Sequence, residues 1–253
     1  MESNILFIVE GKLEKDFFNT ISKRYGIKFD IYTLQTNVYS LYKHLKEMDF
    51  NANIKDVLAE MHPEQKELLQ KKFAYTYLVF DSDLHHPKKN DMRMKKEIVI
   101  DNYKKLEEMA NYFVNETDPT IGKLYINYPM MESFRDCNDF FDDEYKNVCV
   151  DIECIKEYKK MVASKMLHKE HVKDFTRENF DKLVLQNIFK LNQMIRNTWS
   201  KPKYFDYLNM SNCNKILQKQ IDFINNGKLQ VINTSLLFVV DYYGEQLYKN
   251  LNL

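Results

Sequence analysis

An unbroken run of apolar residues at positions 5–9 lies near the start of the chain and ends directly at Glu10. Apolar residues at every position, several of them branched, indicate a strand buried on both faces, because a half-exposed strand would alternate apolar with polar residues. A second, largely apolar run at 75–80 ends directly at Asp81. Strands covered on both faces are typical of parallel sheets flanked by helices. The sequence therefore predicts an α/β fold.

Segments with helical spacing lie between the strand-like segments. Strands that alternate with helices build a parallel sheet, and the sites of such sheets form beyond the carboxyl ends of the strands. We expect further strands at 29–34 and 124–126, and helices at 13–25, at 39–73 with a break near Pro63, and at 93–115.

The pattern becomes mainly helical from about residue 150, with helices expected at 155–168, 176–199 and 213–225. The tail, 229–253, fits either a strand followed by a helix or one buried helix. We therefore divide the chain into a sheet-containing catalytic domain, 1–149, and a helical C-terminal region, 150–253, for dimerisation, substrate or partner contact.

Composition narrows the class of protein. A chain of 253 residues that is 44% hydrophobic can bury a proper core. The 37 basic and 37 acidic residues cancel, so any binding of nucleic acid must come from local patches. The four cysteines form no CxxC pair and are expected to be reduced thiols. No apolar run approaches the roughly 18 residues that a membrane span needs, so a cytoplasmic protein without membrane contact is expected.

The first acidic pair, Glu10 and Glu14, lies where the first strand is expected to meet a helix. Residues four apart share one helical face, so both carboxylates can face the same point. Gly11 would let the backbone turn tightly and approach a ligand closely. The alternative interpretation is an acidic helix N-terminus, where the helix dipole favours glutamate.

The second pair, Asp81 and Asp83, follows the second strand. Alternate residues of an extended segment point the same way, so both carboxylates are expected to project together. They would repel each other, and a divalent cation relieves that repulsion. Oxygen ligands suit Mg²⁺ or Mn²⁺ rather than zinc. The alternative is an exposed turn, since Asp and Ser are common turn residues.

A further carboxylate, Glu132, follows the strand predicted at 124–126. Pro129 suits the first turn of a helix, which would place Glu132 one turn further in. All these acidic residues follow strands, so the sequence predicts that they meet at one edge of the sheet.

Together these motifs resemble the Toprim domain, which is shared by topoisomerases, bacterial primases and overcoming-lysogenization-defect (OLD) nucleases. The resemblance rests on a strand that ends in Glu-Gly, a second Glu four residues later, and Asp-x-Asp after a later strand. The Glu10/Glu14 spacing is more similar to the OLD-type nucleases. The Pro-Met-Met-Glu segment at 129–132 resembles small standalone Toprim nucleases of phage-defence systems such as PARIS, which work beside an ABC-type ATPase. The resemblance covers residues 4–135.

The resemblance implies a nuclease that uses Mg²⁺ or Mn²⁺. Asp81 and Asp83 would hold one ion with Glu10, while Glu14 would help hold a second or act as a general base. Glu132 would be a further ligand.

A basic group should balance the charge that builds on the phosphate. Lys12 is the nearest candidate along the chain, and Lys88 and Lys89 are candidates for substrate binding. Histidines at 85 and 86 could line the phosphate path, although a solvated loop is the alternative and Mg²⁺ disfavours histidine. Basic stretches at 156–173 and 196–203 could also hold substrate. The second includes Trp199, either a base-stacking platform or a core residue that closes a helix.

The same resemblance implies a nucleic acid substrate, an ABC-type ATPase partner and a role as an anti-phage effector. A homodimer formed through the helical second half is a further hypothesis. DNA, messenger RNA and tRNA all remain open as substrates.

Two other interpretations compete. An apolar strand followed by Asp-x-Asp is also the nucleophile motif of haloacid-dehalogenase-like phosphatases, in which Asp81 would attack phosphorus; the Glu10-Gly11 motif would then have no role. Alternatively, the chain is a catalytically silent Toprim-like subunit that binds nucleic acid or an ATPase.

Overall fold

The computed structural model of the protein describes residues 4–86, 95–118 and 120–252. A five-stranded sheet with the order β2-β1-β3-β5-β4 lies at its centre, and only β4 runs antiparallel to its neighbour. The strands are β1 (Ile5–Val9), β2 (Asp30–Thr33), β3 (Tyr75–Asp81), β4 (Val114–Asn115) and β5 (Gly122–Asn127), with β6 (Cys149–Asp151) and β7 (Lys228–Gln230) in a separate small sheet.

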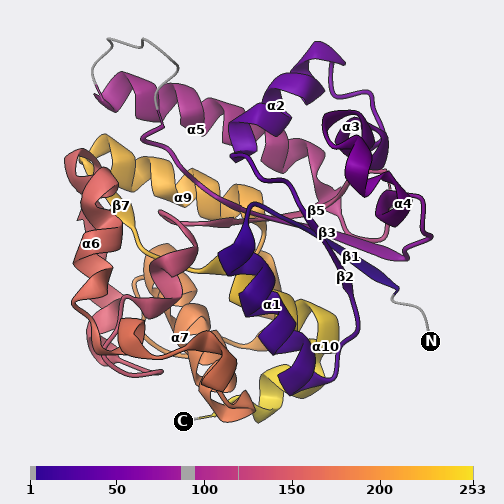
Figure 1. Ribbon diagram of the computed structural model, residues 1–253. Coiled ribbons are helices and arrows are strands. Elements are labelled where there is room, and N and C mark those ends of the chain that lie inside the picture. The colour runs from indigo at the N-terminus through magenta and orange to yellow at the C-terminus, as the bar shows by residue number, and fades with distance from the viewer. Residues whose placement is uncertain (1–3, 87–94, 119, 253) are drawn as a thin grey trace.

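Helices cover both faces of the large sheet, with α2, α3 and α5 on one side and α1, α7 and α10 on the other (Figure 1). The helices are α1 (Lys12–Tyr25), α2 (Val38–Glu47), α3 (Ile54–Met61), α4 (Lys66–Leu69), α5 (Lys95–Tyr112), α6 (Tyr158–Ala163), α7 (Arg177–Arg196), α8 (Tyr204–Met210), α9 (Cys213–Asn225) and α10 (Phe238–Asn250). Short 3₁₀ helices join them: η1 (Pro63–Gln65), η2 (Met131–Arg135), η3 (Asp143–Asn147), η4 (Ile152–Glu157), η5 (Met166–Lys169), η6 (Val172–Asp174) and η7 (Thr234–Leu237).

The prediction of an α/β fold with a parallel sheet flanked by helices is confirmed. All five residues of β1 are buried, as their apolar side chains require when both faces are covered. Phe7 shows how the layers join: its ring centroid lies 4.4 Å from that of Phe18 in α1 and 4.7 Å from that of Phe238 in α10.

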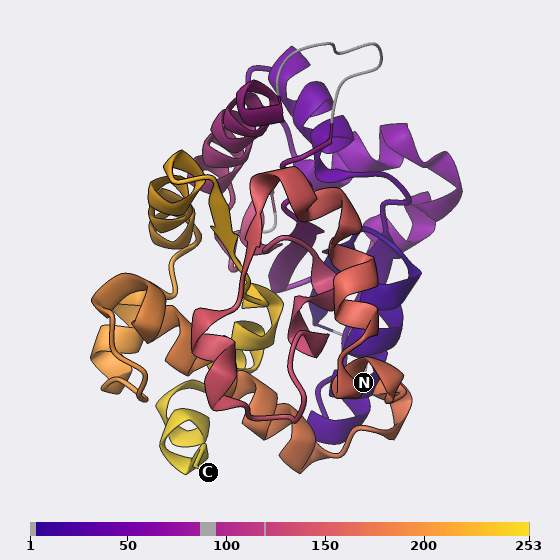
Figure 2. The same cartoon turned by 90° about the vertical axis from the view of Figure 1, so that its left-hand side faces the viewer.

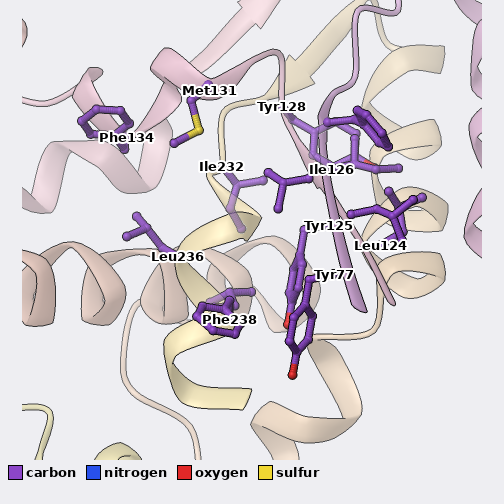
Figure 3. Close-up of a cluster of buried hydrophobic side chains, with 14 of the residues drawn as sticks. Tyr77, Leu124, Tyr125, Ile126, Tyr128, Met131, Phe134, Ile232, Leu236 and Phe238 are labelled. Carbon is purple, nitrogen blue, oxygen red and sulfur yellow. The ribbon is translucent and has the colours of Figure 1, made fainter. Parts of the chain in front are cut away.

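The C-terminal region packs directly against the sheet. Figure 3 shows Ile232 and Phe238 beside Tyr77, Tyr125 and Ile126 of the sheet strands. The ring centroids of Tyr77 and Phe238 are 4.9 Å apart. One hydrophobic core therefore includes residues from both halves of the chain.

The boundary expected between residues 149 and 150 falls inside β6, whose residues pair with β7. The tail, left open by the sequence, is a strand followed by a helix, β7 and α10, with η7 between them. The single long helix expected at 155–168 is wrong. Short 3₁₀ helices and the six-residue α6 occupy that segment.

No helix within the described ranges is long and apolar enough to cross a lipid bilayer.

Candidate active site

Glu10 and Asp81 meet at the carboxyl-end edge of the large sheet. Val9 pairs with Val79 in the parallel β1–β3 ladder, so Glu10 leaves β1 beside the last residues of β3. The backbone amide of Asp81 donates a hydrogen bond of 3.0 Å to Glu10 Oε2. The register of two neighbouring strands therefore brings together two carboxylates that are far apart in the sequence.

Glu14 lies in the first turn of α1 and is only 6% exposed. Its Oε2 accepts a hydrogen bond of 2.9 Å from the Gly11 amide, as an acidic residue near a helix N-terminus can do. The backbone of Gly11 is extended and needs no glycine. A Cβ atom there would lie 3.4 Å from Glu14 Oε2, an ordinary van der Waals distance.

The expectation of an extended backbone through the Asp-x-Asp segment is wrong at Asp83. The φ angle of Asp83 is 39°, in the left-handed region, and the amide of His86 donates to the Asp83 carbonyl at 2.8 Å. The strand thus ends at Asp81 and the chain turns at once. The charge of Asp83 nevertheless raises the pKa of both Glu10 and Asp81.

Glu132 is the second residue of η2, which begins at Met131. The expectation that Pro129 opens this helix is therefore wrong, since Pro129 follows a cis peptide bond outside it. Glu132 Oε1 lies 3.0 Å from Nζ of Lys159, which α6 brings from the C-terminal region. Glu132 belongs to the same group of carboxylates, because its charge raises the pKa of Glu14 and of Asp81.

Burial and mutual repulsion disfavour the charged forms of these carboxylates. Burial, reinforced by the charge of Asp83, raises the pKa of Glu10 to about 8. Burial also raises the pKa of Glu14. The pKa of Asp81 lies well above its ordinary value because of burial and of the charges of Glu10 and Glu14. A cation bound among these carboxylates would stabilise their charged forms and so offset the cost of burial and mutual repulsion.

Two carboxylate oxygens at this edge, Asp81 Oδ1 and Glu132 Oε2, are buried without a hydrogen-bond partner. Such atoms are costly unless something else satisfies them, and hard carboxylate oxygens suit Mg²⁺ or Mn²⁺. Within residues 4–86, 95–118 and 120–252, however, no three His, Cys, Asp or Glu side chains already form a group that could hold a metal ion. The carboxylate oxygens are donors that suit a divalent cation, and binding one would require these side chains to come closer together than they are in this structure.

Lys159 is the cation that the structure places at the carboxylates. Burial of its stem would lower the pKa of Lys159, but the hydrogen bond to Glu132 and the charges of Asp81 and Asp83 raise it. The sequence predicts the basic stretch 156–173 as a possible substrate contact, but its spacing does not single out residue 159. Viewed toward the carboxyl ends of the strands, the segment between β5 and α7 that carries this lysine lies in front (Figure 2).

The other predicted basic residues are placed less closely. Lys12 is exposed in the first turn of α1. Lys88 and Lys89 lie outside the described residues. His85 is partly buried and its pKa is lowered by burial. Trp199 packs against Phe141 and Phe189, as the core interpretation of this tryptophan expects.

Tyr39 also contacts this edge, and nothing in the sequence pattern singled it out. Its hydroxyl donates a hydrogen bond of 2.6 Å to the carbonyl of Ser82, between the two aspartates. The Ser82 hydroxyl in turn donates to the Pro129 carbonyl at 2.9 Å. These contacts fix the backbone of the Asp-x-Asp segment from two sides.

Comparisons with protein-family models, curated proteins and solved structures found no significant match to this chain.

Proposed function

We propose that this chain is a Toprim-like nuclease that hydrolyses phosphodiester bonds with Mg²⁺ or Mn²⁺. The observation that carries the proposal is the hydrogen bond between the Asp81 amide and the Glu10 carboxylate, which joins acids of two parallel strands at the edge where α/β sheets place their sites. The charges of Asp83 and Glu14 raise the pKa of both members of this pair, and the charge of Glu132 raises that of Asp81.

The resemblance to the Toprim domain implies a role for each of these side chains. Asp81, Asp83 and Glu10 would hold one ion, and Glu14 and Glu132 a second. Divalent cations held there would supply a nucleophilic water and charge stabilisation for the leaving oxygen. As an alternative to holding the second ion, Glu14 would act as a general base toward the attacking water. Lys159, now paired with Glu132, would meet the phosphate of the substrate.

A cleavage assay with matched variants tests the proposal. Glu10→Gln and Asp81→Asn should each lower Mg²⁺-dependent cleavage of DNA, messenger RNA or tRNA by at least about 100-fold. Glu178→Gln, which changes an exposed glutamate on α7, should cleave like the wild type. Unchanged cleavage in both site variants would contradict the proposal.

The resemblance to standalone Toprim nucleases extends the proposal to a biological role. We propose a cytoplasmic anti-phage effector that acts with an ABC-type ATPase and can form a homodimer. Cleavage should therefore be measured with the chain alone and with such an ATPase encoded beside it. Binding of nucleic acid without cleavage in either case would favour the catalytically silent subunit, whereas a phospho-aspartate trapped on Asp81 would favour the phosphatase.

A further inference from the structure

A cavity of about 650 Å³ lies between α2 and α5, which pack against each other on one face of the sheet (Figure 1). This volume is within the range of about 300–1,000 Å³ that is usual for small-molecule sites. The carboxylate edge lies beside it, because Tyr39, one of the lining residues, is the side chain that donates to the Ser82 carbonyl.

The lining combines aromatic rings, amides and cations with one carboxylate, that of Glu47. Two tyrosines, Tyr39 and Tyr42, come from α2. Asn102 of α5 is 3% exposed, and its amide group donates to the carbonyls of Leu84 and His86, which fixes its orientation. The side chain therefore forms a rigid polar part of the wall.

Three lysines supply positive charge at this cavity: Lys43, Lys46 and Lys105. Each contacts an acid of the protein, at 3.8 Å from Glu47, 2.8 Å from Glu108 and 3.0 Å from Asp101, respectively. The Lys105 ammonium also lies 5.4 Å from the centre of the Tyr39 ring. Because the pairs that Lys43 and Lys46 form with Glu47 and Glu108 lie at the surface, an arriving phosphate can compete for these two ammonium groups.

We propose that this cavity binds one nucleotide unit, with the base against the tyrosines and the phosphate at Lys43 and Lys46. Aromatic rings stack on bases of any sequence, while lysines bind phosphate as point charges. We assign the nucleotide to the substrate strand next to the scissile phosphate, an assignment that rests on the proposed nuclease function. The same chemistry would also accept a free nucleotide.

The test measures binding separately from cleavage. In an Asp81→Asn background with EDTA, a fluorescent single-stranded oligonucleotide is titrated and its anisotropy recorded. Lys43→Glu and Tyr42→Ala should each weaken binding about tenfold. Lys249→Glu and Tyr75→Ala are the matched controls: Lys249 pairs with a glutamate four residues away, as Lys43 does, and Tyr75 is exposed at the start of β3. Both should bind within about twofold of the parent.

A second titration uses adenosine monophosphate as the ligand and calorimetry as the readout. It distinguishes a site for a free nucleotide from a site for the substrate strand. If the cavity variants lose binding of the mononucleotide but keep that of the oligonucleotide, the strand assignment is overturned and the nucleotide site stands. Unchanged affinity for both ligands in both variants overturns the proposal. If Lys43→Glu and Tyr42→Ala weaken binding but the wild-type protein never cleaves nucleic acid, the nucleotide site stands and the nuclease function is rejected. If the wild-type protein cleaves but neither variant weakens binding, the nucleotide site is rejected and the nuclease function stands.

Discussion

The Asp81 amide donates a hydrogen bond to Glu10 Oε2 at 3.0 Å, across a separation of 71 residues in the sequence. This bond holds the last residue of β3 against the first residue after β1 at the carboxyl-end edge of the sheet.

Lys159→Ala should lower cleavage by about 100-fold, because the variant lacks the cation that contacts Glu132 and acts on Asp81 and Asp83. The measurement is single-turnover cleavage at saturating Mg²⁺. Lys160→Ala is the control, since the neighbouring lysine is exposed and pairs with Glu157. Equal rates for the two variants would exclude a role for Lys159.

The stability of the protein in EDTA should fall as the pH rises from 4.5 to 8. The pKa of Glu10 is raised from 4.5 to about 8, chiefly by burial and then by Asp83. Between these values the folded protein keeps a proton that the unfolded chain releases, so the free energy of unfolding decreases with pH. The decrease should amount to a few kcal/mol at most.

Urea denaturation between pH 5 and 8 measures this effect. Glu10→Gln should flatten the decline, whereas Glu178→Gln should keep the slope of the wild type. Parallel curves for the wild type and Glu10→Gln would show that Glu10 titrates at its ordinary pKa in the folded protein.

Asn233→Leu should both destabilise the fold and weaken metal-dependent cleavage. The buried Asn233 amide donates to the Met131 carbonyl at 2.9 Å, and its Oδ1 accepts from the Ser235 hydroxyl at 2.6 Å. Leucine would leave these groups unpaired, at a cost of about 2–3 kcal/mol. Because Met131 precedes Glu132, the variant should also need several-fold more Mn²⁺ for half-maximal cleavage. Asn209→Leu, on the exposed side of α8, should change neither property.

Lys190→Met should lower the free energy of unfolding by about 3 kcal/mol, as measured by urea denaturation. The ammonium of this fully buried lysine donates to the carbonyls of Tyr145, Lys146 and Val148 at 3.1, 3.1 and 2.8 Å. Methionine fills similar space but leaves all three carbonyls without that donor. Lys182→Met, on the same helix and partly exposed, is the control. A loss below about 0.5 kcal/mol would mean that water replaces the ammonium.

The sheet and the positions of Glu10 and Asp81 could be predicted because they depend on local pattern. An apolar run that ends at an acid marks a strand end, and parallel strands align their carboxyl ends. The direction of Asp83 could not be predicted, since it depends on a turn closed by the His86 amide.

The pairing of Glu132 with Lys159 was equally hidden from the sequence. The pair forms because α6, from the second half of the chain, packs beside η2. The spacing of apolar residues along the sequence does not predict a contact between such distant segments. The same holds for the cavity between α2 and α5, whose lining residues look like ordinary surface residues of two helices.

Whether the carboxylates at this edge hold divalent cations is tested most directly by a Mn²⁺ titration in which electron paramagnetic resonance detects the bound ion. The wild type should bind Mn²⁺ at micromolar to low millimolar concentrations, while Asp81→Asn should bind at least about tenfold more weakly. An Asp81→Asn protein that binds Mn²⁺ as tightly as the wild type, or a wild type that binds none, would contradict cation binding at this edge.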